Sequence, residues 1–240
     1  MSVIFHGWLE AMERLEYVTG SIGRFRSTVC FEMPRASALD GISAMPDLVR
    51  SPYPLCWCEG PSELPAPFHG MKRVCFLLTD LEGNATGAEV YLTDGSAFGE
   101  MGRAIYEAGA WRSWHGPEID RFPGGPNDEV MSSCLLYVER FLSLVNCANI
   151  DRVENKPSQE HQLRRKKQGK KPLYSYWTLI LSQASEKAES KGGTHASPRV
   201  HLRRGHIRRL GGKHIWVRAC AVGNKKLGVI HKDYAMQVIQ

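Results

Sequence analysis

The sequence has no long hydrophobic run, although 42% of its 240 residues are hydrophobic. No apolar stretch approaches the roughly 20 residues that a membrane-spanning helix needs, so we predict no membrane partner. Acidic residues interrupt the first 18 positions before the apolar core of a signal peptide could form. The cysteine count is seven, an odd number, which favours reduced thiols. Together these features predict a soluble cytoplasmic protein.

The chain also lacks the common catalytic and cofactor-binding motifs. It contains no G-x-x-x-x-G-K-S/T loop, no G-x-S-x-G elbow and no dinucleotide-binding glycine motif after a strand. Cys56 and Cys58 form a lone C-x-C pair, and the nearest companions, His69 and Cys75, have no regular spacing. We therefore predict no metal and no cofactor. A non-enzymatic role is favoured, and the question of catalysis stays open.

Charge is distributed very unevenly along the chain. Residues 1–150 carry 11 basic and 19 acidic residues, a net charge of −8, whereas residues 151–240 carry 20 basic and 6 acidic residues, a net charge of +14. Such asymmetry indicates a polyanion-facing surface on the second part. Two alternatives stay open: the two parts attract each other, or the basic excess only solvates a face.

These features predict an α+β protein with three segments. Residues 1–150 form an acidic mixed α/β portion, residues 151–171 a basic linker or arm, and residues 172–240 a small basic module. In the arm, six cations fall within the eight positions 164–171, where mutual repulsion opposes packing. The module is expected to be an antiparallel β structure, either a twisted sheet or a partly open barrel.

Hydrophobic periodicity predicts the following elements in the first part. Helices are expected over residues 2–18, over 98–111, and from Asn127 or Asp128 onward. The last of these has an apolar stripe for the core, made of Met131, Leu135, Val138, Leu142 and Val145. Residues 73–79 and 88–93 are expected to pair as a hairpin. Cys134, Cys147 and Cys220 lie in apolar surroundings and are expected in the core.

In the second part, five strands are predicted. They cover residues 173–181, 200–210, 213–222, 227–230 and 234–239. The second and third should form a hairpin through the two-residue turn Gly211-Gly212. Aromatic residues lie among the charges: Tyr174, Tyr176, Trp177, Trp216 and Tyr234. Core packing is the favoured role of each, base stacking on exposed rings stays open, and Trp216 is the least clear case.

The segment 199–210, with the sequence RVHLRRGHIRRL, combines histidine and arginine on one strand. A bulge at Arg204-Gly205 would bring His201 and His206 to the same side, together with Arg208. Histidine and arginine on a rigid strand suit phosphate binding. They also suit metal-independent RNA cleavage, in which the two imidazoles act as base and acid and arginine stabilises the phosphate charge. A purely structural basic face is the third possibility.

Several short motifs in residues 127–240 resemble a group of uncharacterised bacteriophage and prophage proteins. They are G-K-K-P-L at 169–173, H-L-R-R-G-H-I-R-R-L at 201–210, W-V-R at 216–218, V-G at 222–223 and K-D-Y at 232–234. The resemblance implies a phage origin and an infected bacterial cell as the setting. It implies no catalytic residue. In that setting, small proteins that inhibit host defence complexes, such as CRISPR effectors, are common.

The leading hypothesis is a phage-encoded binding protein, for example an anti-CRISPR inhibitor. Its basic module would engage a host nucleoprotein complex, a nucleic acid or a host protein directly. The expected contacts are Arg164, Arg165, Lys166, Lys167, Lys170, Lys171, Arg203, Arg204, Arg208 and Arg209. One alternative is a metal-independent endoribonuclease that uses His201, His206 and Arg208. Another is an inhibitor that acts on a protein through the acidic part.

Overall fold

The computed structural model describes residues 28–64, 68–81, 84–95, 98–115, 128–170, 172–180 and 199–229. Within these ranges the chain forms an α+β structure around a mixed eight-stranded sheet that does not close on itself. The sheet order is β6-β5-β4-β3-β2-β1-β8-β7. Two smaller sheets follow, one of two strands and one of three. The predicted helix over residues 2–18 lies outside the described residues.

The strands of the large sheet, in chain order, are β1 (Val29–Glu32), β2 (Leu55–Pro61), β3 (Arg73–Leu81), β4 (Ala85–Thr93), β5 (Phe98–Glu107), β6 (Ala110–His115), β7 (Asp151–Asn155) and β8 (Tyr176–Ile180). β1 is parallel to both β2 and β8, whereas every other neighbouring pair is antiparallel. The predicted hairpin over residues 73–93 is confirmed as β3–β4, with longer strands than expected.

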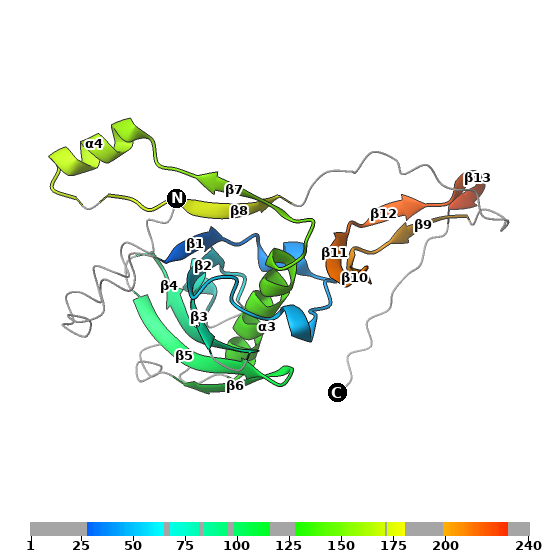
Figure 1. The fold of residues 1–240 in the computed structure, drawn as a ribbon, viewed down its shortest axis with the longest axis horizontal. Helices are drawn as coiled ribbons and strands as arrows, with labels where there is room; N and C mark the ends of the chain where they lie inside the picture. Colours follow the sequence, from blue (N-terminus) through cyan, green and yellow to red (C-terminus); the bar gives the residue numbers. More distant parts are fainter. Residues whose placement is uncertain are drawn as a thin grey trace.

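The central helix α3 (Asp128–Val145) packs against one face of the sheet, and Figure 1 shows strands β3 to β6 curving around it. All five residues of the predicted apolar stripe are buried, which confirms the helix and its core face. Alternate strand residues such as Phe76, Leu78 and Val90 meet this helix and form the central cluster with it. Figure 1 also shows that the helix lies within the hollow of the sheet.

The opposite face of the sheet has its own apolar group, the outer cluster. It consists of Cys30, Leu55, Trp57, Cys75, Leu77 and Tyr91. Burial of both faces explains why β2 and β3 are almost continuously apolar in sequence. Strands β2 and β3 also have a neighbouring strand on each side, so neither of them is an edge strand.

The helix predicted over residues 98–111 is wrong, because this stretch forms the antiparallel strands β5 and β6. The strands turn at Ala108 and Gly109, whose φ angles are 53° and 85°. Two consecutive residues with positive φ match the tight turn that fits the twist of a hairpin. Alanine seldom adopts this conformation, so the sequence offers a weak turn signal there.

The connection between β1 and β2 lies along α3. It contains the short 3-10 helices η1 (Ala36–Leu39) and η2 (Pro46–Leu48), and a third, η3 (Phe68–Gly70), precedes β3. The Ser143 hydroxyl accepts a hydrogen bond from the backbone N–H of Met45 at 3.1 Å, and the Asn146 side chain donates to the carbonyls of Leu48 and Arg50. The C-terminal half of α3 thus fixes the position of η2.

The second part of the chain departs from the expected three segments. Residues 151–171, expected as a linker or arm, contain strand β7 and helix α4 (Gln159–Lys167). Strand β8 joins the large sheet between β1 and β7, because Trp177 and Leu179 pack against the central cluster. No described helix is long and apolar enough to cross a membrane.

The remaining strands are β9 (Arg199–Arg203), β10 (His206–Leu210), β11 (Lys213–Val217), β12 (Cys220–Val222) and β13 (Asn224–Val229). β10 pairs with β11 and β9 with β12, both antiparallel, whereas β13 runs parallel to β9. The expected C-terminal module is therefore two small sheets and is not wholly antiparallel. The strand predicted over residues 234–239 lies outside the described residues.

Candidate nucleic-acid interface

Residues 199–222 form two consecutive antiparallel pairs, β10–β11 and β9–β12, which we call the basic ribbon; β13 adds a third strand on the other side of β9. His206 pairs with Val217, and Arg203 pairs with Cys220, so the register is the same on both sides of a two-residue gap. The predicted turn is confirmed, since Gly211 and Gly212 have φ angles of 55° and 76°. Figure 1 shows the ribbon extending away from the large sheet.

The basic ribbon is attached to the body of the protein by apolar packing. Ile207 and Trp216, which are directly opposite each other, pack against the central cluster. A Cβ atom at Gly205 would lie 2.6 Å from the Trp216 ring, so the indole needs the space that glycine leaves. Core packing, the expected role of the described aromatic residues, is confirmed for Trp216; Tyr234 lies outside the described residues.

Polar contacts fix the same end of the ribbon. Asn149 donates from its side-chain amide to the Trp216 carbonyl at 2.9 Å and accepts from the Trp216 N–H at 2.7 Å. The backbone N–H of Ala148 donates to the His214 carbonyl at 2.8 Å. These contacts tie β11 to the turn that follows α3, so the ribbon has a defined direction relative to the helix.

An ion pair completes the attachment. Arg209 Nη2 lies 2.5 Å from Asp47 Oδ2, and His214 Nε2 lies 3.2 Å from the same oxygen. Partial burial raises the pKa of Asp47, but the hydrogen bond from Arg209, a backbone hydrogen bond and the charges of His214 and Arg209 together outweigh it, so this pKa lies below its ordinary value. Asp47 belongs to η2, and it therefore links the acidic part of the sequence directly to the basic part.

The four predicted arginines of the ribbon have different surroundings. All four are exposed, namely Arg203, Arg204, Arg208 and Arg209. Arg209 is committed to Asp47, as described above, and shares the body-facing side with Ile207. Strand alternation puts Arg208 on the other side, together with His206, Ile215 and Val217, which are half-buried. We call this the outward face of the ribbon.

The expected bulge at Arg204-Gly205 is wrong. An equal number of residues, two, separates the paired segments on each strand, so no residue is inserted and the side-chain alternation is not reset. His201 Nδ1 lies 3.1 Å from the backbone carbonyl oxygen of Arg199, two residues earlier. His206 Nδ1 lies 3.2 Å from the carbonyl oxygen of Arg204 in the same way. Among the described residues, no hydrogen bond joins the two imidazoles, and simple alternation along the strand puts them on opposite faces.

The other predicted basic group lies on helix α4. Ser158 caps the helix by accepting from the His161 N–H, and the Gln162 side chain exchanges two hydrogen bonds with the backbone of Leu173. The cations occupy the last turn, where they are favourable for the helix dipole; they are Arg164, Arg165, Lys166 and Lys167. Lys170 is exposed beyond the helix, and Lys171 lies outside the described residues.

The structure separates these two basic groups. In Figure 1, α4 lies at one end of the molecule, beyond the β7–β8 pair, and the basic ribbon lies at the other. Arg164 forms an ion pair with Glu160 at 2.5 Å. The ten predicted contact residues therefore do not form one continuous surface, and any partner that touches both groups must be long.

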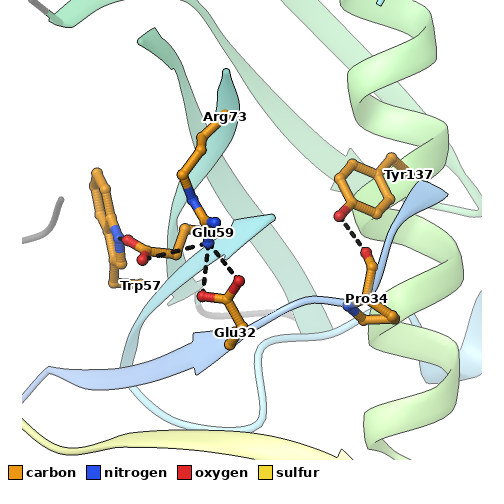
Figure 2. A network of polar contacts seen from close by, with 6 residues as sticks. All are labelled: Glu32, Pro34, Trp57, Glu59, Arg73 and Tyr137. Carbon is orange, nitrogen blue, oxygen red and sulfur yellow. Dashed lines mark hydrogen bonds and ion pairs between the residues drawn. The ribbon is translucent and has the colours of Figure 1, made fainter. Parts of the chain in front are cut away.

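A charged network at the edge of the outer cluster was not predicted. Figure 2 shows Arg73 between two glutamates, with Nη2 at 2.5 Å from Glu32 Oε1 and 3.5 Å from Glu59 Oε1. Glu59 is buried and accepts from the Trp57 indole N–H at 2.8 Å. Burial lowers the pKa of Arg73, but the hydrogen bond to Glu32 and the charges of Glu32 and Glu59 together outweigh it and leave the pKa raised. The network joins β1, β2 and β3, which is a structural role.

The signal for this network was present in the sequence. Glu59 interrupts the apolar strand LCWCEGP, and Arg73 begins the next apolar strand. A charged residue inside a buried strand predicts an oppositely charged or hydrogen-bonding side chain nearby, because an unpaired buried charge is strongly unfavourable. What the sequence alone did not supply was the pairing that brings Arg73 next to β2.

The cysteines are mostly buried thiols. Cys134 and Cys147 lie in the core as expected, and burial raises the pKa of Cys134 to about 12. The expectation for Cys220 is wrong: it is exposed on β12, because the ribbon is too thin to bury both of its faces there. Cys56 and Cys58 belong to the central cluster, whereas Cys75 belongs to the outer cluster across the sheet. No metal-binding group of three occurs in the described ranges.

Comparisons with protein-family models, with curated proteins and with solved structures find no match for this chain. Its function must therefore be inferred from the residues and the geometry described above.

Proposed function

We propose that this protein binds nucleic acid, free or within a host nucleoprotein complex, through the basic ribbon. The observation that carries the proposal is the charge of the ribbon. Residues 199–222 contain six arginines and one lysine and no acidic residue, and all seven cations are exposed. Exposed arginine and lysine neutralise phosphates and release condensed counterions, which is the main source of affinity for nucleic acid.

The attachment of the ribbon supports the same proposal. A mobile basic segment would have to be ordered on binding, which weakens the interaction. Here the contacts of Trp216, Asn149 and Asp47 already hold one end of the ribbon against the body. The arginines are thus presented on a preformed element, and Arg209 contributes to its attachment through the ion pair with Asp47.

The resemblance to bacteriophage and prophage proteins favours an infected bacterial cell as the setting. Within it, we propose a host nucleic-acid-handling complex as the target, a CRISPR effector being one example, and inhibition without catalysis as the outcome. The supporting observation is the charge of the basic ribbon.

The test is a binding titration of the full chain against a fluorescently labelled nucleic acid at several salt concentrations. The ribbon variant replaces four exposed arginines by alanine, namely Arg203, Arg204, Arg208 and Arg218. The matched control removes four charges from α4, namely those of Arg164, Arg165, Lys166 and Lys167. Both variants keep Arg209, so the attachment to Asp47 is preserved.

We expect the ribbon variant to lose most of its affinity. For double-stranded DNA, the slope of log K against log salt concentration should become less negative by about 3 to 4. The α4 control should change far less. Recovery of intact probe on a denaturing gel separates binding from cleavage. Equal loss in the two variants would mean that net charge, rather than the ribbon, determines binding, and unchanged affinity in the ribbon variant would refute the proposal.

A further inference from the structure

We infer that the ligand of the basic ribbon is double-stranded DNA in the B form, and that the outward face of the ribbon enters the major groove. This inference rests on the proposed function. Its first support is shape. The B-DNA major groove, about 12 Å wide, admits a two-stranded β-ribbon, whereas the major groove of an A-form RNA helix is too deep and narrow for side chains to read.

The two-stranded part of the ribbon is the β10–β11 pair. Each of its strands has five residues, roughly 16 Å at about 3.3 Å per residue. Ile207 and Trp216 face the body from one side of this pair, so the outward face lies on the side away from the central cluster.

The aromatic content of the ribbon argues against a single-stranded ligand. Proteins that bind single strands stack bases on exposed aromatic rings. Trp216 is the only Phe, Tyr or Trp in residues 199–222, and it faces the central cluster. The ribbon thus offers charge without a stacking surface, and a base-paired ligand needs no such surface.

The chemistry of the outward face suits base edges. Arg208 is exposed there, and an arginine can donate two hydrogen bonds to O6 and N7 of guanine. Ile215, directly opposite Arg208, and Val217, directly opposite His206, add apolar contacts of the kind that thymine methyl groups accept. Lys213, at the turn, and Arg203, further along the ribbon, are exposed and suited to flanking phosphates.

The test compares the full chain on four probes of one mixed sequence: a 24-base-pair DNA duplex, the matching RNA duplex, single-stranded DNA and single-stranded RNA. We expect the DNA duplex to bind at least about 10-fold more tightly than the others. Methyl green, which occupies the major groove, should compete, and netropsin, which occupies the minor groove, should not.

A pair of variants separates base contact from phosphate contact. Arg208→Lys keeps the charge but loses the two-pronged donor, so it should preserve the salt dependence and reduce the preference for guanine-containing duplexes about 10-fold. Lys213→Ala should weaken all duplexes alike and lower the salt slope by about 1.

The outcomes distinguish the inference from the proposed function. Equal binding to RNA or to single strands, or competition by netropsin alone, would overturn the major-groove inference while leaving nucleic-acid binding intact. No binding to any of the four probes would overturn both.

Discussion

Replacing Gly60 by alanine should destabilise the whole fold, because this glycine lies directly beneath the ring of Tyr137. A Cβ atom at position 60 would lie 1.9 Å from the Tyr137 hydroxyl oxygen and 2.9 Å from the ring carbon that carries it. Tyr137 is buried, and its hydroxyl donates to the Pro34 carbonyl at 2.5 Å, as Figure 2 shows. The ring cannot move aside without breaking that bond.

Two costs combine in this variant. Overpacking a core site costs about 1–3 kcal/mol. Loss of a hydrogen bond to a buried partner costs about 1–3 kcal/mol more. We therefore expect the free energy of unfolding to fall by about 4 kcal/mol, which lowers Tm by roughly 8–16 °C in a chain of this length.

Thermal unfolding followed by calorimetry provides the measurement, and Gly70→Ala provides the control. A Cβ atom at Gly70 would meet no atom within 4 Å, so this variant should stay close to the parent protein. Tyr137→Phe removes the closest atom of the clash, so adding Gly60→Ala to it should cost less than adding it to the parent. Equal Tm values for Gly60→Ala and Gly70→Ala, or strictly additive effects with Tyr137→Phe, would refute this account of the packing.

Three other perturbations test separate contacts. The pKa of Asp47 lies below its ordinary value, so the stabilisation from its pair with Arg209 is present above about pH 4 and disappears as pH falls through the folded-state pKa. Amide protection factors over residues 206–217, which correct for the intrinsic exchange rate at each pH, should fall in acid, whereas those of Asp47→Asn should be low already at pH 7; protection factors in the parent that do not change with pH would contradict this. Arg73→Leu should lower the free energy of unfolding by about 3 kcal/mol, because it removes the ion pairs of Arg73 with Glu32 and with the buried Glu59, and a change below about 0.5 kcal/mol in urea unfolding would contradict the network. One thiol per native chain, that of Cys220, should react rapidly with a thiol reagent, and rapid labelling of Cys134 would show that the core is not packed as described.

Elements with a strong local pattern could be predicted from the sequence. The stripe on α3 repeats at helical spacing, and all of its residues are buried. The glycine pair at 211–212 marked the turn of the ribbon. In both cases the information lies within a few neighbouring residues, so single-sequence reasoning reaches it.

Pairing between distant segments could not be predicted in the same way. Strand β8 was recognised as a strand, but its parallel partner β1 lies more than 140 residues earlier, and its apolar side chains pack on the central cluster. Nothing local in residues 173–181 distinguishes a place in a large sheet from a place in a small one. Residues 98–111 show the opposite problem, since their turn relies on an alanine with positive φ.

In the candidate site too, local features could be predicted from the sequence and contacts between distant residues could not. Exposed arginines on a strand follow from charge and alternation, and the structure does expose all four predicted in the ribbon. The role of Arg209 depends on Asp47, which lies 162 residues away, so the sequence could not separate an attachment residue from a contact residue. The separation of α4 from the ribbon likewise follows only from the tertiary fold.

Part of the charge asymmetry of the sequence is used inside the molecule, because Asp47 of the acidic part pairs with Arg209 of the basic part. The ion pair directs Arg209 toward the body, and strand alternation then directs Arg208 away from it. The position of Asp47 depends on η2, which Ser143 and Asn146 hold against α3. The helix core and the outward face are therefore linked: the contacts that neutralise one arginine also determine which side of the ribbon faces away from the body.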